Sequence, residues 1–208
     1  MRAEVPEHVT IVAVSKAQPV EAVAAALAAG AADIGENYVQ EAGRKFKALG
    51  GTRFTKHFIG HVQTNKAKAI VESFDVVQSV DRLEAARALA KAARALGKQL
   101  PVLLQLNISP SERFGVAPAD AGAFAAELRR EESLRLDGVM AIGPLDASPA
   151  ETARAFAMAA KTFRQIGGRT LSLGMSGDWR EAVEAGSTMI RIGSALFGAR
   201  PALGGVED

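Results

Sequence analysis

The stretch TIVAVSK, residues 10–16, decides how the rest of this sequence is interpreted. Its run of four apolar residues, three of them β-branched, is typical of a strand buried on both faces in a parallel sheet. Lys16 then follows the carboxyl end of that strand, where α/β folds place their ligands. This lysine is either an ordinary solvated amine or a Schiff-base lysine. The second role requires a partly desolvated, cation-rich site, because only the uncharged amine attacks an aldehyde.

Composition narrows the class of protein. The chain has 208 residues, 48% of them hydrophobic, which is enough for one sizeable core. A net charge of +2 is too small to indicate nucleic acid or a membrane surface as a partner. No apolar run reaches a membrane-spanning length, and the N-terminus lacks a signal-peptide core. Because cysteine is absent, disulfides, cysteine nucleophiles and thiolate metal sites are excluded. We expect a cytoplasmic protein.

Strand-like runs alternate with alanine-rich helical runs along the whole chain. We expect strands at residues 10–14, 33–34, 54–59, 74–79, 102–108, 136–142, 170–173 and 188–192. We expect helices at residues 20–29, 38–49, 62–72, 82–96, 118–130, 149–166 and 179–185, with a short terminal helix beginning at Ser194. Asp81 is the expected cap of the fourth helix.

This alternation predicts an α/β fold, a closed (β/α)8 TIM barrel that forms a single domain over residues 1–208. The main competitor is an open doubly wound sheet. Its phosphate-binding fingerprint G-x-G-x-x-G should follow the first strand, but the sequence there reads SKAQP, residues 15–19. We therefore favour the barrel.

The segments GMSGD and RIGSA stand at the seventh and eighth strand ends, where barrels commonly bind phosphate. Ser176 and Ser194 offer hydroxyl donors, and Gly177 and Gly193 allow the backbone to come close to an anion. The free amides of the terminal helix would face the same anion. The alternative is that these residues only form two tight turns.

Arg191 lies between two isoleucines on the last expected strand, so alternation directs its side chain into the barrel mouth. It forms either a buried structural ion pair or the partner of an acceptor atom on a ligand. In the second case Lys16, Arg191 and the phosphate loops converge on one molecule with an aldehyde, an acceptor and a phosphate. Pyridoxal 5′-phosphate carries all three.

Seven segments add a family resemblance. They are VAVSK from Val12, IGENYVQE from Ile34, HFIGHVQTNK from His57, VQSVDR from Val77, LLQLNIS from Leu103, DGVMAIG from Asp137 and LSLGMSGDWREAVEAGSTMIRIGSALFGAR from Leu171. In these segments the chain resembles the pyridoxal phosphate homeostasis proteins, a family of barrels similar to the N-terminal domain of alanine racemase. The resemblance covers nearly the whole chain and is specific when the segments are taken together.

The resemblance implies a role for each matching residue. Lys16 would form the internal aldimine with pyridoxal phosphate, Arg191 would face the pyridine nitrogen, and Asn37 would lie close to the ring. The phosphate would be held by Ser176, Gly193 and Ser194. Three further residues fall in matching segments and are expected only near the site, namely Asn65, Lys66 and Met140.

Two features depart from the family pattern. The family usually begins with a helix before the first strand, whereas nine residues precede Thr10 here. We expect either a less well covered barrel bottom or a chain that starts late. In the fifth loop, the lysine that usually precedes a glycine is replaced by Arg113-Phe114-Gly115, so the positive charge lies one residue further from the glycine.

The chemistry of the predicted site favours a carrier over an enzyme. An arginine at the pyridine nitrogen opposes protonation of the ring, which makes it a poorer electron sink. Racemisation needs a second base, which racemases of this kind take from a tyrosine on an additional domain; the single tyrosine here, Tyr38, is expected to be packed. We predict a monomer without robust catalytic activity that supplies pyridoxal phosphate to apoenzymes. The alternatives are an amino-acid racemase of the alanine-racemase type, or a lyase, and a barrel that binds another phosphorylated metabolite.

Two other candidate sites are weak. His57 and His61 have helical metal-ligand spacing, but the pair begins inside an expected strand and lacks the glutamate of a zinc-protease motif. Asp178 could act as an acid, although it is better placed to cap the helix that starts at Trp179. We therefore predict no metal site and no catalytic residue.

Overall fold

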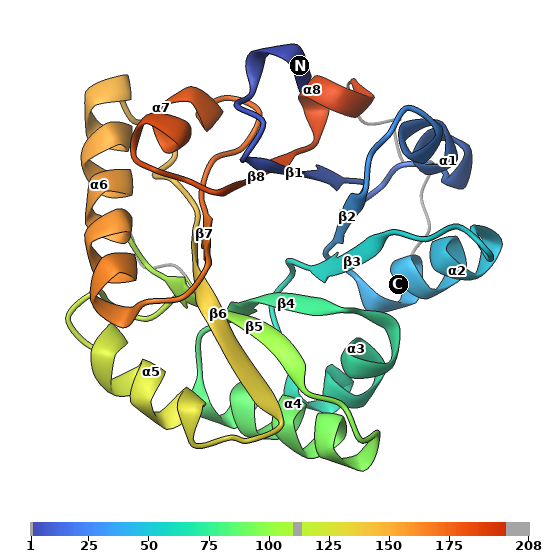
Figure 1. Cartoon of the computed structure of the whole chain (residues 1–208), viewed down its shortest axis with the longest axis horizontal. Helices are drawn as coiled ribbons and strands as arrows, with labels where there is room; N and C mark the ends of the chain where they lie inside the picture. The colour runs from blue at the N-terminus through green and yellow to red at the C-terminus, as the bar shows by residue number, and fades with distance from the viewer. Residues whose placement is uncertain (1, 110–113, 199–208) are drawn as a thin grey trace.

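Eight parallel strands close into a barrel in the computed structural model, which describes residues 2–109 and 114–198 (Figure 1). The strands are β1 Thr10–Val14, β2 Asp33–Glu36, β3 Thr55–Phe58, β4 Val76–Val80, β5 Leu100–Leu106, β6 Leu134–Ala141, β7 Thr170–Ser172 and β8 Met189–Ile192. Each pairs with the next in the chain, and β8 pairs with β1 through the register Thr10 to Met189. The predicted closed barrel is confirmed, and the open sheet is excluded.

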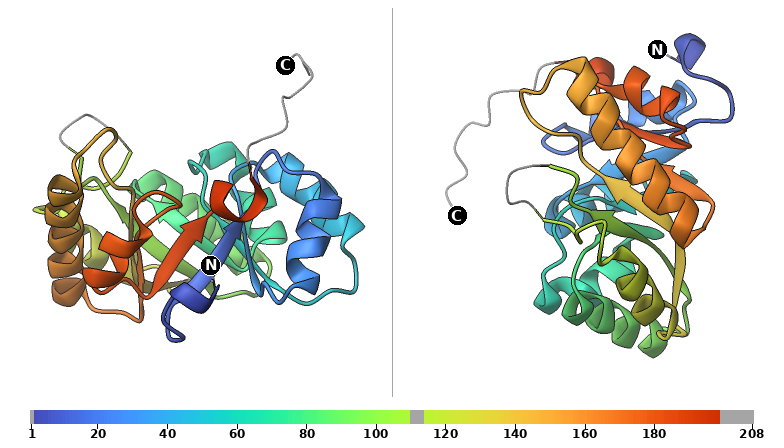
Figure 2. Two further views of the ribbon diagram at one scale, coloured as in Figure 1. Left: turned by 90° about the horizontal axis from the view of Figure 1, so that it is seen from above. Right: turned by 90° about the vertical axis from the view of Figure 1, so that its left-hand side faces the viewer.

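Helices surround the strands, as Figure 1 shows. They are α1 Val20–Ala28, α2 Val39–Ala48, α3 Ala67–Ser73, α4 Leu83–Ala95, α5 Ala121–Arg129, α6 Pro149–Ile166, α7 Trp179–Glu184 and α8 Ser194–Phe197, with short 3-10 turns η1 Arg2–Glu4 and η2 Thr64–Lys66. The side views in Figure 2 show α1 (blue) and α6 (orange) running alongside the barrel wall. Within the described residues, no helix is long and apolar enough to cross a membrane.

Helix α6 has the bounds that its sequence predicts because its start is locally encoded. Ser148 Oγ accepts a hydrogen bond from Glu151 N at 3.3 Å, and a Glu151 carboxylate oxygen accepts one from Ser148 N at 2.8 Å. This capping box pairs two backbone amides that would otherwise lack partners, and Pro149 fits the first turn.

Several helix starts differ from the prediction, among them those of α3, α4 and α5, the last of which begins at Ala121 rather than at residue 118. Asp81 does not cap α4: the N-cap residue is Arg82, which makes no side-chain cap bond. The Asp81 carboxylate instead lies 3.5 Å from Arg82 Nε. Helix α3 begins at Ala67 rather than Val62, because residues 64–66 form the 3-10 turn η2.

The hydrophobic core fills the layer between the strands and the helices. Phe58 and Phe74 pack edge to face with ring centroids 5.2 Å apart, in the same cluster of buried residues as Leu89 of α4. The alanines of α4 pack into this core, and five residues of that helix are buried. In α1 only Val23 is buried, and its alanines line an open groove of about 740 Å³ with β1 and α8. The alanine-rich helices therefore differ in how far their alanines contribute to the core.

The segment before β1 also packs against the barrel. Val5 and Val9 are buried in a small cluster with Trp179, Ile190 and Ile192. Arg2 holds this segment by donating to Val9 O and Glu7 O, each at 2.8 Å. Side chains near the N-terminus thus pack against α7 and β8.

Candidate functional site

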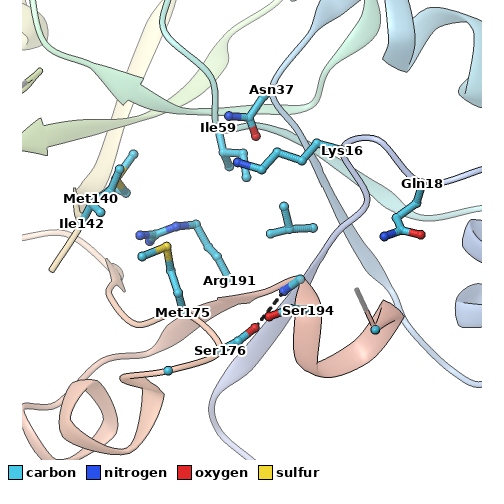
Figure 3. Close-up of a pocket in the computed structure, with 14 residues that line it drawn as sticks. Lys16, Gln18, Asn37, Ile59, Met140, Ile142, Met175, Ser176, Arg191 and Ser194 are labelled. Atoms are coloured by element: carbon cyan, nitrogen blue, oxygen red, sulfur yellow. Dashed lines mark hydrogen bonds between the residues drawn. The ribbon is translucent and has the colours of Figure 1, made fainter. Parts of the chain in front are cut away.

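A cavity of about 300 Å³ lies at the carboxyl ends of the strands (Figure 3). It is lined by all six residues that the sequence selects for cofactor binding, namely Lys16, Asn37, Ser176, Arg191, Gly193 and Ser194. Met140, expected near the site, lines it as well. In Figure 3, Lys16 and Asn37 approach from one side, and Ser176 and Ser194 lie on the opposite side. The barrel thus brings together residues that are far apart in sequence.

Two loops are joined at the serine end of this cavity. Ser176 Oγ accepts hydrogen bonds from Gly193 N and Ala195 N, both at 3.3 Å. The hydroxyl therefore ties the loop after β7 to the first turn of α8. A side chain at Gly177 would meet no atom within 4 Å, and one at Gly193 would make only ordinary contacts with Val14. Open space next to amides and hydroxyls is what an anion requires.

Gly174 shapes this end of the cavity for a different reason. Its φ of +89° lies in the left-handed region, and a Cβ there would lie 2.6 Å from Ala182 Cβ. A glycine is therefore required for the chain to leave β7 and turn close over α7. The loop that follows carries Met175 and Ser176 to the cavity.

Arg191 is buried and held by uncharged oxygens. Its Nη1 donates to Ser172 O at 2.8 Å and to Ser172 Oγ at 2.7 Å, and its Nη2 donates to Ala141 O at 2.8 Å. Burial lowers the pKa of Arg191 to about 10, against the opposing effect of the Asp178 carboxylate. The guanidinium is thus still charged at neutral pH. Among the described residues none forms a salt bridge with Arg191, which disfavours the structural ion pair.

A directional row of hydrogen bonds crosses the barrel interior from Arg191. Ser172 accepts from Arg191 and donates to Gln78 Oε1 at 2.8 Å. The Gln78 amide nitrogen lies 2.9 Å from His57 Nδ1, and His57 Nε2 lies 2.8 Å from Asp33 Oδ1. Because a carboxylate only accepts, His57 carries its proton on Nε2 and accepts from Gln78 on Nδ1. The side chains in this row come from four other strands, and together they fix the position of Arg191.

Asp178 occupies the N-cap position of α7, as predicted, but its side chain does not bond to that helix. Its Oδ1 accepts from Met175 N at 2.5 Å instead. Burial raises the pKa of Asp178, and the bond from Met175 and the charge of Arg191 oppose that rise. The carboxylate therefore shapes the loop that carries Ser176.

A second cavity, of about 410 Å³, adjoins the first and shares Asn37, Ile59 and Ile142 with it. Lys66 lines this second cavity rather than the first, and Asn65 lines neither. Tyr38, at the start of α2, is 62% exposed, so the expectation that it is packed was wrong. Its backbone is extended at the N-cap, which directs the ring outward to the rim of this cavity.

The two histidines do not form a pair. His57 points into the barrel, whereas the His61 ring stacks on Phe114 with centroids 4.1 Å apart. Among the described residues there is no group of three or more histidines and acids that could hold a metal ion. Arg113, together with residues 110–112, lies outside the described residues, so its expected contact is not tested.

Several residues of the site were missed by sequence reasoning. Ser172 and Gln78 stand at inward positions of β7 and β4, and their polar side chains within apolar strands were an available signal. The other missed residues that line the cavity are Val14, Gln18, Ile59, Ile142, Met175 and Gly198. Apolar strand residues and isolated loop residues of these types occur in many places that are not sites, and they carry no local signature.

The set of side chains fits pyridoxal phosphate. The cavity contains one primary amine, one buried cation, two serine hydroxyls and the amides of a helix start. The side-chain oxygen of Asn37 is buried and has no hydrogen-bond partner among the described residues, which leaves an acceptor available to a ligand. The cavity volume lies at the lower end of the range for small-molecule sites.

Comparison with known proteins points to the same family. The family described as alanine racemase, N-terminal domain, matches residues 1–201. The pyridoxal phosphate homeostasis protein of Escherichia coli (strain K12) is 43% identical over 207 residues, which cover 94% of this chain and 87% of that protein. The protein of the same name from Pseudomonas aeruginosa is 43% identical over 198 residues, covering 94% of this chain and 86% of that one.

Solved structures are also similar. PipY of Synechococcus elongatus PCC7942, solved with PLP bound, is 38% identical, with a TM-score of 0.89 over 95% of this chain and 96% of that one. Alanine racemase of Clostridium difficile 630 is 16% identical, with a TM-score of 0.79 over 97% of this chain and 55% of that one. The second likeness is one of fold alone.

Proposed function

This chain belongs to the pyridoxal phosphate homeostasis protein family, and on that premise we propose that it holds pyridoxal 5′-phosphate reversibly at Lys16. The observation that carries the proposal is the convergence of the Lys16 amine, the buried Arg191 and the joined serine loops on one cavity. When bound, the cofactor supplies an aldehyde that condenses with a primary amine and releases water. The bond to Lys16 would form by loss of water and break by hydrolysis, so storage and release would need no reagent besides water.

Each predicted residue has a part in this function. Ser176, Ser194 and the start of α8 would hold the phosphate; the Gly193 and Ala195 amides, which donate to Ser176 Oγ in this structure, favour a negative charge there. Arg191 would face the ring nitrogen and oppose its protonation, and Asn37 would orient the ring beside Lys16. Gly193 keeps the phosphate loop free of a side chain.

We propose a carrier rather than an efficient enzyme. A charged Arg191 at the ring nitrogen removes most of the electron withdrawal on which amino-acid chemistry depends. Tyr38 is the single tyrosine of the chain, and it lies at the rim of the second cavity rather than in the first. The two relatives that are 43% identical are named homeostasis proteins rather than racemases, which supports the same view.

We further propose that the protein acts as a monomer in the cytoplasm and supplies the cofactor to apoenzymes. The small net charge of +2 supports neither nucleic acid nor a charged membrane surface as a partner. Transfer to an apoenzyme would be measured as the recovery of activity by an enzyme from which pyridoxal phosphate has been removed. In one arrangement this enzyme shares a compartment with the loaded protein, and in the other a dialysis membrane separates the two. Recovery in both arrangements would mean release into solution.

The test of the site is chemical trapping. The protein is incubated with pyridoxal phosphate, its visible absorbance is recorded, and borohydride reduction is followed by peptide mass mapping. We expect a yellow protein whose reduced cofactor maps to Lys16, and no labelling there in Lys16→Ala. Lys68→Ala, which removes an amine with 80% side-chain exposure on α3, is the matched control and should label normally. A colourless protein that stays unlabelled would overturn the proposal.

A further inference from the structure

A buried cluster of charges lies under the loop that carries Lys16. At its centre is Lys45 on α2, only 8% exposed. Its ammonium donates three hydrogen bonds, to Ser15 O at 2.5 Å, Glu36 Oε1 at 2.7 Å and Glu41 Oε1 at 2.6 Å. These three partners use all the donors that a lysine has. We call Lys45, Glu36 and Glu41 the clamp.

The clamp holds the peptide groups on both sides of Lys16. The Ser15 carbonyl, which precedes Lys16, accepts from Lys45, and the Ala17 amide, which follows it, donates to Glu41 Oε1 at 2.7 Å. Glu36 completes the cluster by accepting from Ser15 Oγ at 2.6 Å. No side-chain atom of Lys16 is needed for any of these bonds, so its amine can point into the cavity.

The loop adopts a backbone conformation that needs such support. Ala17 has φ of 60°, in the left-handed region that a residue with a Cβ rarely occupies. Conformations of this kind are energetically unfavourable and persist only where the surroundings enforce them. Two bonds hold this loop: the Ala17 amide donates to Glu41, and Gln18 N donates to Ser15 O at 3.0 Å.

A buried ion cluster is a poor device for stability alone. Burial raises the pKa of Glu36, while its bonds from Lys45 and Ser15 act in the opposite direction. Taking charges out of water costs about as much as their attraction returns, so such clusters are better explained by the geometry they impose. The geometry here is that of the two peptide groups next to Lys16.

We propose that Glu41 and Lys45 are positioning residues that fix the Ser15–Ala17 backbone so that the Lys16 amine meets the cofactor aldehyde in a reactive orientation. The inference rests on the proposed function but concerns residues that do not line the cavity. It predicts that loosening the clamp slows bond formation at Lys16 more than it weakens the phosphate contacts.

The test compares Glu41→Ala with Glu41→Gln. The glutamine retains an oxygen that can accept from Ala17 N, whereas the alanine removes it. We expect Glu41→Ala to slow borohydride-trappable bonding at Lys16 on the order of ten- to a hundredfold, as misplacement of a reacting group does. Glu41→Gln should recover most of that rate. If both variants were equally slow, the effect would come from charge alone, and positioning through Ala17 would be wrong.

A second pair of measurements separates this inference from the function on which it rests. Hydrogen exchange of the Ala17 amide in the cofactor-free protein should be faster in Glu41→Ala and close to wild type in Glu41→Gln. Unchanged exchange in Glu41→Ala would overturn the clamp whether or not the cofactor binds. If the wild type fails to label at Lys16, the proposed function fails, and faster exchange would still support the clamp as a loop device.

The control removes an equivalent pair elsewhere. Lys68 and Glu72 on α3 have the same i,i+4 spacing, with their charged atoms 3.8 Å apart and exposed. Glu72→Ala should leave both the trapping rate and Ala17 exchange unchanged. Lys45→Met should slow trapping as Glu41→Ala does, because it removes the side-chain bond to the Ser15 carbonyl and leaves that oxygen only the bond from Gln18 N. A wild-type rate in Lys45→Met would exclude Lys45 from the positioning role.

Discussion

The guanidinium of Arg191 and the hydroxyl of Ser172 lie 2.7 Å apart inside the barrel, on the neighbouring strands β8 and β7. Ser172 is fully buried and passes the hydrogen bond on to Gln78 across the barrel. The cation at the candidate site is therefore aligned by side chains that do not line the cavity. This relationship connects the barrel interior to the chemistry proposed above.

Replacing Ser172 by alanine should displace Arg191. The change removes one acceptor of the guanidinium and the donor to Gln78, so we expect a loss of about 1–3 kcal/mol in the free energy of unfolding. The absorbance band of the bound cofactor should also shift, because the charge at the ring nitrogen moves. Ser187→Ala is the control: Ser187 is equally buried but bonds only to strand backbone, so it should lower stability without changing the spectrum.

Replacing Ser176 by alanine should weaken the phosphate end alone. The hydroxyl joins the loop after β7 to the amides of Gly193 and Ala195. We expect the affinity for pyridoxal phosphate to fall roughly three- to tenfold, the effect of one hydrogen bond. Fluorescence titration with pyridoxal, which lacks the phosphate, provides the comparison. An equal loss for both ligands would contradict a phosphate role for Ser176.

The acid stability of the barrel should depend on Asp137. Partial burial alone would raise the pKa of Asp137, but hydrogen bonds and charge from Arg135 and Arg169 lower it below its usual 3.8. The native state then binds fewer protons than the unfolded state. The ionised Asp137 therefore stabilises the fold above the usual pKa of 3.8, and this stabilisation is lost as the pH falls through the lower pKa of the native state. In urea denaturation between pH 5 and 2.5, the free energy of unfolding should fall less steeply for Asp137→Asn than for wild type.

A matched variant gives that measurement its control. Asp120 is exposed at the start of α5, and Asp120→Asn changes the same charge by the same amount. The prediction fails if Asp120→Asn and Asp137→Asn reduce the loss of unfolding free energy at acid pH equally.

Tyr38 should not serve as a base. The loaded protein is incubated with L-alanine in heavy water, and the α-proton is followed by NMR together with the appearance of D-alanine. We expect exchange at or near the rate given by free pyridoxal phosphate, and no change in Tyr38→Phe. Racemisation at a catalytic rate that disappears in Tyr38→Phe would replace the carrier with the racemase alternative.

Removal of the α6 capping box should lower stability without affecting the site. Ser148→Ala leaves the Glu151 amide unpaired, at a cost of about 1 kcal/mol. Thermal melting measures the loss. The trapping rate at Lys16 should stay at the wild-type value, since α6 supplies no residue to the first cavity.

The order of strands and helices could be predicted because each element is specified locally. Apolar runs of four to seven residues, helical periodicity and the Ser148 start all act over a few neighbouring residues. The α4 cap was misassigned because the Asp81 carboxylate lies 3.5 Å from Arg82 and 4.0 Å from His61 instead of bonding to the helix amides, and His61 comes from a distant loop that a local rule does not include.

The sequence by itself determined the barrel, and with it the end at which Lys16, Ser176 and Arg191 meet, because every parallel strand places its carboxyl end on the same side. Only the tertiary structure decided what holds those residues in place. Gln78 and Ser172 are 94 residues apart in the chain yet share a hydrogen bond, and Lys45 reaches Ser15 from a neighbouring helix. Side-chain bonds of this kind depend on strand register and on which face each residue presents. Those properties arise from closure of the whole sheet, which no single segment encodes.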